Sequence, residues 1–72
     1  MTKKPKITNT IRRLRFDADE MTQKQLAEAV GVTRQTIVAI ENAKYYPTLE
    51  LAYMIARTFD KALEEVFQVD FD

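Results

Sequence analysis

The chain's only glycine, Gly31, separates two short segments whose patterns favour helix, and this feature limits the possible folds most strongly. In the first segment, TQKQLAEAVG, Thr22 and Gln25 have the spacing of a capping box, in which each side chain satisfies a backbone N–H of the other residue. The residues expected on the buried side of this segment are Leu26, Ala27 and Val30. Because glycine readily adopts the left-handed conformation that ends helices, we expect the helix to end at Gly31.

The second segment, RQTIVAIENAK, has the pattern of a helix that starts with hydrogen-bond donors. Thr33 is placed to cap it, and Ile37 and Ile40 are expected to point into the core. The side chains expected to point outward are Arg34, Gln35 and Val38. Two short helices joined by a tight glycine turn, with polar side chains leading the second helix, are typical of a helix-turn-helix.

Apolar spacing predicts three further helices. The first helix is expected near the amino terminus, capped near Thr8 or Asn9, with a buried side formed by Ile7, Ile11, Leu14 and Ala18. Thr48 is expected to cap a helix over LELAYMIARTF with a buried side formed by Leu51, Ala52, Ile55, Ala56 and Phe59. A short fifth helix is expected around Leu63, Val66 and Phe67. No segment has a convincing strand pattern, so the predicted fold class is all-α, a compact five-helix bundle.

Composition removes several classes of function. A chain of 72 residues has room for one domain, and it contains no cysteine and no histidine. Disulfide scaffolds, thiolate nucleophiles and histidine-based metal or acid–base sites are therefore excluded. We expect no catalytic residues, no metal ligands and no cofactor, and hence no enzyme. No stretch reaches the roughly 18 apolar residues of a membrane span, and we expect a cytoplasmic protein without a membrane partner.

The net charge is zero, but the charges are unevenly distributed along the chain. Residues 1–15 carry six basic side chains and no acidic one, whereas residues 45–72 carry six acidic side chains against two basic ones. Such a molecule can present a positive face to a polyanion while its far side stays acidic. The basic segment 1–6, with Lys3, Lys4 and Lys6, is predicted to be an arm that follows a nucleic-acid backbone, or else a solvated tail.

The sequence from TQKQLAEAVG to LELAYMIARTF resembles the Cro/phage-repressor (Xre) family of helix-turn-helix proteins. The shared features are the T-Q start, L-A, the turn glycine, an I-x-x-I-E core, and a proline before a helix of the L-x-x-A-x-x-x-F kind. The resemblance covers roughly residues 7–67 and implies a five-helix bundle of the lambda-repressor-like type whose third helix enters the DNA major groove. The domain is therefore expected at 7–67, after the arm at 1–6 and before a tail at 68–72.

The resemblance also implies roles for individual residues. The residues implied to contact bases are Arg34, Gln35, Thr36, Val38 and Ala39. The residues implied to contact phosphates are Gln23, Thr33, Asn42 and Lys44. Arg15 of the first helix is implied to form a structural ion pair with Glu41.

The chain departs from the family pattern where the third helix ends. Ala43 stands where glycine is common, so either this alanine adopts a left-handed conformation or the helix continues, which leaves the position of Lys44 open. Asp60 similarly replaces a frequent glycine, although aspartate tolerates this conformation better. The loop DADEM is also one residue longer than the shortest family versions.

The predicted function is sequence-specific binding of double-stranded DNA by a small transcriptional regulator, a repressor that acts as a homodimer on a palindromic operator. The dimer surface is assigned to the fifth helix and the tail around Phe67, Val69 and Phe71. One alternative is an antitoxin-type module that binds a toxin or other protein partner and represses its own operon. Another is a protein-interaction module that has lost DNA recognition, for which acidic or apolar residues would be expected at the start of the third helix.

Overall fold

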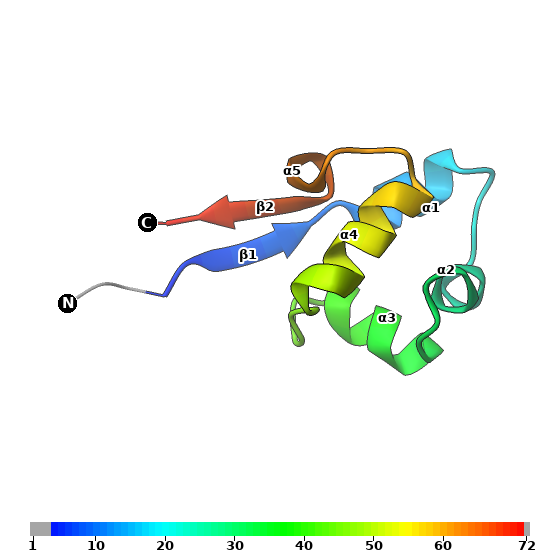
Figure 1. Ribbon diagram of the computed structural model, residues 1–72, viewed down its shortest axis with the longest axis horizontal. Helices are drawn as coiled ribbons and strands as arrows, with labels where there is room; N and C mark the ends of the chain where they lie inside the picture. The colour runs from blue at the N-terminus through cyan, green and yellow to red at the C-terminus, as the bar shows by residue number, and fades with distance from the viewer. Residues whose placement is uncertain (1–3, 72) are drawn as a thin grey trace.

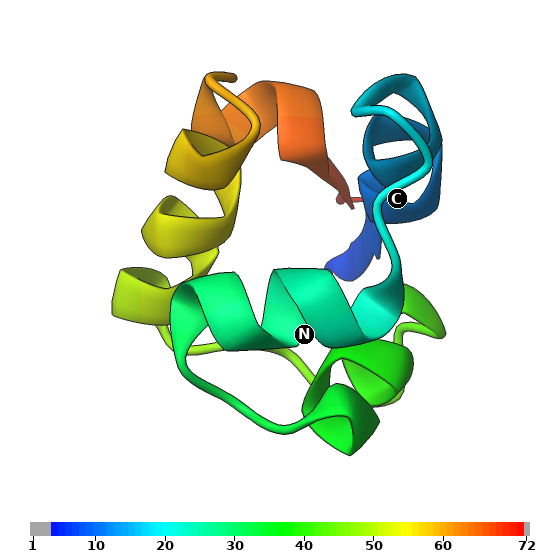
Figure 2. The same cartoon turned by 90° about the vertical axis from the view of Figure 1, so that its right-hand side faces the viewer.

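The computed structural model describes residues 4–71 and contains five helices and a two-stranded sheet in that range (Figure 1). The elements in chain order are β1 (Lys6–Asn9), α1 (Ile11–Asp17), α2 (Gln23–Val30), α3 (Arg34–Glu41), α4 (Leu49–Thr58), α5 (Leu63–Val66) and β2 (Phe67–Asp70). The helices surround a core at one end of the molecule, and the two strands extend away from it as a ribbon (Figures 1 and 2).

The predicted apolar sides of the second, third and fourth helices form most of this core. Of the side predicted for the first helix, only Ile11 is buried, whereas Ile7, Leu14 and Ala18 are half-buried. The side chains that are almost fully shielded from solvent are Ile11, Leu26, Ile37, Ile40, Ile55 and Val66. Ala27, Val30, Leu51, Ala52 and Ala56 are also buried. The predicted buried side of the second helix is therefore confirmed, and that of the fourth is confirmed except at Phe59, which is only half-buried. Burying an aliphatic side chain contributes about 1.5–3 kcal/mol, and this packing fixes how α2, α3 and α4 meet.

Short side-chain contacts set where these helices begin and end. Thr22, Thr33 and Thr48 each accept a hydrogen bond from the backbone N–H three residues later, and Gln25 completes the capping box on α2. Gly31 follows α2 with a φ of +76°, the left-handed conformation expected for it. The predicted starts of the second, third and fourth helices are therefore confirmed.

The prediction that no segment forms a strand is wrong. β1 and β2 pair antiparallel, with Ile7 opposite Val69 and Asn9 opposite Phe67. The predicted all-α class holds for most of the chain but not for its ends. Phe67, expected in the fifth helix, and residues 68–70, expected in a tail, belong to β2. Residues 1–3 of the expected arm lie outside the described residues, as does Asp72.

The start of the first helix also differs from the prediction. α1 begins at Ile11 with Thr10 as its N-cap, not near Thr8 or Asn9, because the residues before it belong to β1. The Asn9 side chain accepts a hydrogen bond from the Ile11 N–H at 3.2 Å and donates one to the Ile40 carbonyl at 2.8 Å. Asn9 therefore links β1 to the end of α3 as well as to α1.

Candidate functional site

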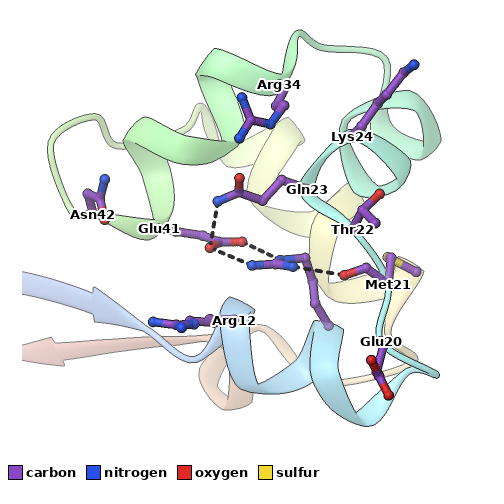
Figure 3. Close-up of a pocket in the computed structure, with 10 residues that line it drawn as sticks. Arg12, Glu20, Met21, Thr22, Gln23, Lys24, Arg34, Glu41 and Asn42 are labelled. Carbon is purple, nitrogen blue, oxygen red and sulfur yellow. Dashed lines mark hydrogen bonds and ion pairs between the residues drawn. The ribbon is translucent and has the colours of Figure 1, made fainter.

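The candidate site is built on α2 and α3, which meet across the turn at Gly31. Beyond the glycine, the Val32 N–H donates to the Ala27 carbonyl at 3.0 Å, which closes the end of α2. Thr33 then starts α3, and its hydroxyl lies 3.0 Å from that of Thr36. These local bonds place the first turn of α3 at the surface, beside the first turn of α2 (Figure 3).

The two sides of α3 differ sharply in exposure. Ile37 and Ile40 are buried in the core, whereas Arg34 and Gln35 in the first turn are exposed. Thr36, Val38 and Ala39 are half-buried. Of the predicted base-contacting residues, Arg34 and Gln35 are thus presented most openly to solvent, and the other three border them on the same helix.

An ion pair joins α1 to the end of α3. Arg15 of α1 contacts Glu41 through two nitrogens, with Nε 2.6 Å from Oε2 and Nη2 3.0 Å from Oε1. The side chains retain only 14% and 7% of their full exposure. The Arg15 guanidinium also donates to the Met21 carbonyl at 2.8 Å, which anchors the loop after α1. The predicted pair is confirmed, and the longer loop does not prevent it.

Gln23 joins this pair to α2. Its Nε2 atom donates to Oε1 of Glu41 at 3.2 Å, so the first residue of α2 is tied to the last residue of α3 (Figure 3). The carboxylate of Glu41 thus accepts hydrogen bonds from two different elements. This network fixes the relative positions of α1, α2 and α3 around the candidate site.

A shallow groove of about 600 Å³ lies over this network. Gln23 and Asn42, both predicted to contact phosphates, line it together with Arg34. Thr33 and Lys44, predicted for the same role, are exposed elsewhere and are not among its lining residues. Sequence reasoning missed Arg12 and Lys24, which also line the groove (Figure 3).

Charges in the groove favour an anionic ligand. Its lining residues with a positive charge are Arg12, Arg15, Lys24 and Arg34, and those with a negative charge are Glu20 and Glu41. Because Arg15 and Glu41 neutralise one another, the cations of Arg12, Lys24 and Arg34 are opposed only by Glu20 among the described lining residues. Arg12 could have been found from the sequence, since it lies three residues before Arg15 and so on a similar side of the helix.

The end of α3 settles the alternatives left open at Ala43. This residue has a φ of +58°, in the left-handed region, and the Lys44 N–H donates to the Ala39 carbonyl at 2.9 Å. The helix therefore stops, and Lys44 is exposed just beyond it. Asp60 likewise has a left-handed φ of +56°.

The sequence matches a family model described as helix-turn-helix, HTH_3, over residues 11–72. The chain belongs to the Cro/phage-repressor (Xre) family of helix-turn-helix DNA-binding proteins. This is a family of proteins that are not enzymes. The resemblance inferred from the T-Q, I-x-x-I-E and proline motifs is thereby confirmed.

Relatives of this helix-turn-helix protein occur in archaea and bacteria. A protein of Archaeoglobus fulgidus named as an HTH-type transcriptional regulator is 54% identical over 50 residues, covering 69% of this chain and 70% of its own. One of Methanothermobacter thermautotrophicus with the same designation is 51% identical over 53 residues, covering 72% and 77%. YgzD of Bacillus subtilis, also named so, is 48% identical over 48 residues, covering 67% and 73%.

A solved structure shares the fold of this helix-turn-helix chain. The crystal structure of a protein from Bacteroides fragilis superposes with a TM-score of 0.75 at 21% identity, covering 86% of this chain and 98% of that one. Within residues 4–71, no helix has the length and apolar character needed to cross a bilayer. The same residues hold no group of three or more acidic side chains placed to bind a metal ion.

Proposed function

We propose that this protein is a transcriptional repressor that binds a specific double-stranded DNA sequence as a homodimer, with α3 in the major groove. The observation that carries the proposal is the exposure of Arg34 and Gln35 on the first turn of a helix whose opposite side is locked in the core. The major groove admits an α-helix, and the first turn of a recognition helix is the part that meets base edges.

The chemistry of the exposed turn suits base contacts. A guanidinium such as that of Arg34 can donate two hydrogen bonds to guanine O6 and N7, and a carboxamide such as that of Gln35 can pair with adenine N6 and N7. Each such contact provides about 1–3 kcal/mol of discrimination between bases. Val38 and Ala39 offer small apolar groups for a thymine methyl, and the Thr36 hydroxyl can bond to either kind of base edge.

Polar residues around α3 would hold the phosphates. We assign this role to Gln23, Thr33, Asn42 and Lys44, and we add Arg12 and Lys24 because they share the groove with Gln23 and Asn42. Contacts to phosphates set the orientation of the protein on DNA without selecting a sequence. The unbalanced positive charge of the groove supports this assignment.

A homodimer follows from the small size of one module. One recognition helix contacts few base pairs, whereas two copies related by a two-fold axis would place their α3 helices about 34 Å apart on one face of the DNA. The operator would then be palindromic, because its symmetry mirrors that of the dimer.

The alternative of an interaction module without DNA recognition predicts acidic or apolar residues in the first turn of α3. The residues in that turn are Arg34, Gln35 and Thr36, which favours the DNA-binding proposal. No comparable observation favours the antitoxin-type alternative.

The direct test is binding to the duplex that lies upstream of the protein's own gene, compared with a shuffled duplex of the same composition. We expect affinity for the upstream duplex to exceed that for the shuffled one by about a thousandfold or more at physiological salt. Fluorescence anisotropy across a salt series measures both. Equal affinities at every salt concentration would overturn the proposal.

A variant pair tests the assigned residues. Arg34→Ala combined with Gln35→Ala should abolish the preference for the upstream duplex, because the two proposed base contacts are lost. Arg57→Ala, which removes an exposed arginine from α4, serves as the charge-matched control and should keep the preference. Circular dichroism checks that both proteins retain their helices. A double variant that still prefers the same duplex would contradict the assignment.

A further inference from the structure

The ribbon formed by β1 and β2 has two different faces. Side chains alternate between the faces of a strand, and residues directly opposite one another share a face. The register therefore places Ile7, Asn9, Phe67 and Val69 on one face. It places Lys6, Thr8, Gln68 and Asp70 on the other. One face is mainly apolar and the other is polar.

The apolar face of the ribbon continues onto the start of α4. An apolar groove of about 320 Å³ runs between them, lined by Ile7, Phe67 and Val69 on the ribbon side. Its other lining residues include Tyr46 in the loop before α4, Leu49 at the start of α4, and Leu63 of α5. Tyr53 extends the same surface, because it lies one helical turn beyond Leu49 and lines a neighbouring hollow together with Leu63.

Several large side chains of this surface are exposed. Leu49 is 68% exposed, Tyr53 56%, Tyr46 48% and Val69 47%, and Phe71, two residues beyond Val69, is 78% exposed. With full areas of about 150–250 Å² for large side chains, the five expose on the order of 600 Å². We refer to Ile7, Tyr46, Leu49, Tyr53, Leu63, Phe67, Val69 and Phe71 as the ribbon–α4 face.

We propose that the ribbon–α4 face is the surface on which a second copy of this chain docks, so that two copies pack face to face across a two-fold axis. The inference rests on the proposed DNA-binding function and deepens it by locating the dimer contact. A stable interface of standard size buries about 800 Å² per partner. The exposed area of the five side chains, together with the half-buried Ile7, Leu63 and Phe67, approaches this value.

The chemistry of the face favours a second copy as its occupant. None of its eight residues is charged, so two identical faces can meet across a two-fold axis without like charges opposing one another. An uncharged aromatic and aliphatic surface offers nothing to pair with phosphates or with a charged peptide. Tyrosine and phenylalanine are also the residue types enriched at the centre of protein interfaces.

The position of the face fits the geometry that a DNA-bound dimer requires. The ribbon and the start of α4 lie to one side of α3, and α2 lies to its other side (Figure 1). The loop that contains Tyr46 follows α3 directly in the chain, so the ribbon–α4 face adjoins the end of α3 that lies away from Arg34. A second copy docked there leaves the groove lined by Arg34 and Gln23 open to DNA.

Two matched variants test the interface by sedimentation equilibrium. Leu49→Glu places a charge on the face at the first residue of α4, where an acidic side chain is compatible with the helix. Phe16→Glu changes a side chain of similar exposure, 65%, on α1 outside the face. We expect the unaltered chain and Phe16→Glu to be dimeric at micromolar concentration. Leu49→Glu should raise the dissociation constant of the dimer at least a hundredfold, while thermal melting shows that both variants fold.

A second measurement uses the absence of cysteine from the chain. Val69→Cys introduces one thiol on the face, and Phe16→Cys introduces one outside it. A short bis-maleimide should join two copies of Val69→Cys into a covalent dimer and leave Phe16→Cys monomeric. Equal cross-linking of the two variants would overturn the proposed interface.

The outcomes separate this inference from the proposed function. An unaltered chain that stays monomeric at tens of micromolar overturns the interface, as does a Leu49→Glu variant that dimerises normally. Conversely, a chain that dimerises through this face but binds upstream and shuffled duplexes equally supports the interface and overturns the DNA-binding proposal.

Discussion

Two arginines of α1, Arg13 and Arg15, form ion pairs in very different surroundings. Arg15 lies 2.6 Å from Glu41 of α3, and both side chains are largely shielded from solvent. Arg13 lies 3.4 Å from Asp17, one turn further along α1, and these side chains retain 78% and 55% of their full exposure. The first pair links two helices and receives a third element through Gln23, whereas the second connects α1 only to itself.

The comparison shows that the side of α1 on which an arginine lies decides its contribution. An exposed pair gains little, because water screens the attraction and two flexible side chains must be ordered. In a shielded pair, the attraction between the charges offsets the unfavourable removal of both from water. Removing one partner therefore leaves the other charge buried without compensation. Four variants and one control would test this difference, and the stability of each can be measured by urea unfolding monitored by circular dichroism.

The largest effect is expected for Glu41→Ala. It leaves the shielded Arg15 guanidinium without its carboxylate and Gln23 without its acceptor, and we expect the free energy of unfolding to fall by about 3 kcal/mol. In a chain of this length, such a loss removes much of the total stability. A loss below about 1 kcal/mol would show that the pair behaves like an exposed one.

Replacing both partners should cost less than removing Glu41 alone. In the double variant Arg15→Met and Glu41→Leu no uncompensated charge remains, and we expect unfolding free energy to fall by about 1–2 kcal/mol. The remaining loss reflects the carbonyl of Met21 and the amide of Gln23, which lose their partners. A double variant less stable than Glu41→Ala would contradict the role of the stranded charge.

Removing Gln23 tests the third member of the network. Gln23→Ala deletes one hydrogen bond to a charged acceptor and leaves the ion pair intact, and we expect a loss of about 1 kcal/mol. Gln25→Ala, which breaks the capping box of the same helix without touching Glu41, is the matched control. Each of these two substitutions is also combined with Glu41→Ala. If the loss in unfolding free energy caused by Gln23→Ala is as large in the Glu41→Ala background as in the unaltered chain, as expected for Gln25→Ala, Gln23 is not coupled to the ion pair.

The smallest effect is expected at the exposed pair. Asp17→Ala should change the free energy of unfolding by no more than about 0.5 kcal/mol, because pairs four residues apart on an exposed helix contribute about that much. The change should also shrink as salt concentration rises. A loss comparable to that of Glu41→Ala would remove the distinction between the two pairs.

The starts of α2, α3 and α4 were predictable because they depend on neighbouring residues. Thr22 caps α2 through the backbone N–H three residues later, and Gly31 ends it through its own conformation. The ribbon was not predictable in this way. Ile7 and Val69 come from opposite ends of the chain, and each strand has four residues, too few for an alternating pattern to stand out.

The candidate site was predictable only in part for a similar reason. The exposure of Gln35 follows from its place opposite Ile37 and Ile40 on one helix. Arg34 is exposed at the first position of the same helix. The spacing of Arg12 and Arg15 could have placed Arg12 near the ion pair, but that Lys24 shares the groove depends on how α1 and α2 pack, which no local pattern gives. At Ala43 the sequence is compatible either with a left-handed residue that ends α3 or with a longer helix. The structure shows the left-handed conformation, together with a hydrogen bond from the Lys44 N–H to the Ala39 carbonyl.

Through Asn9, the ribbon is bonded directly to the last turn of α3. The Asn9 side chain holds the Ile40 carbonyl from a strand position opposite Phe67. A slip of the strands by one residue would turn every side chain of β1 to the other face and withdraw this bond. Only a chain whose two strands pair in the observed register therefore has the last turn of α3 held by this bond, so the order of α3 depends on residues from both ends of the chain.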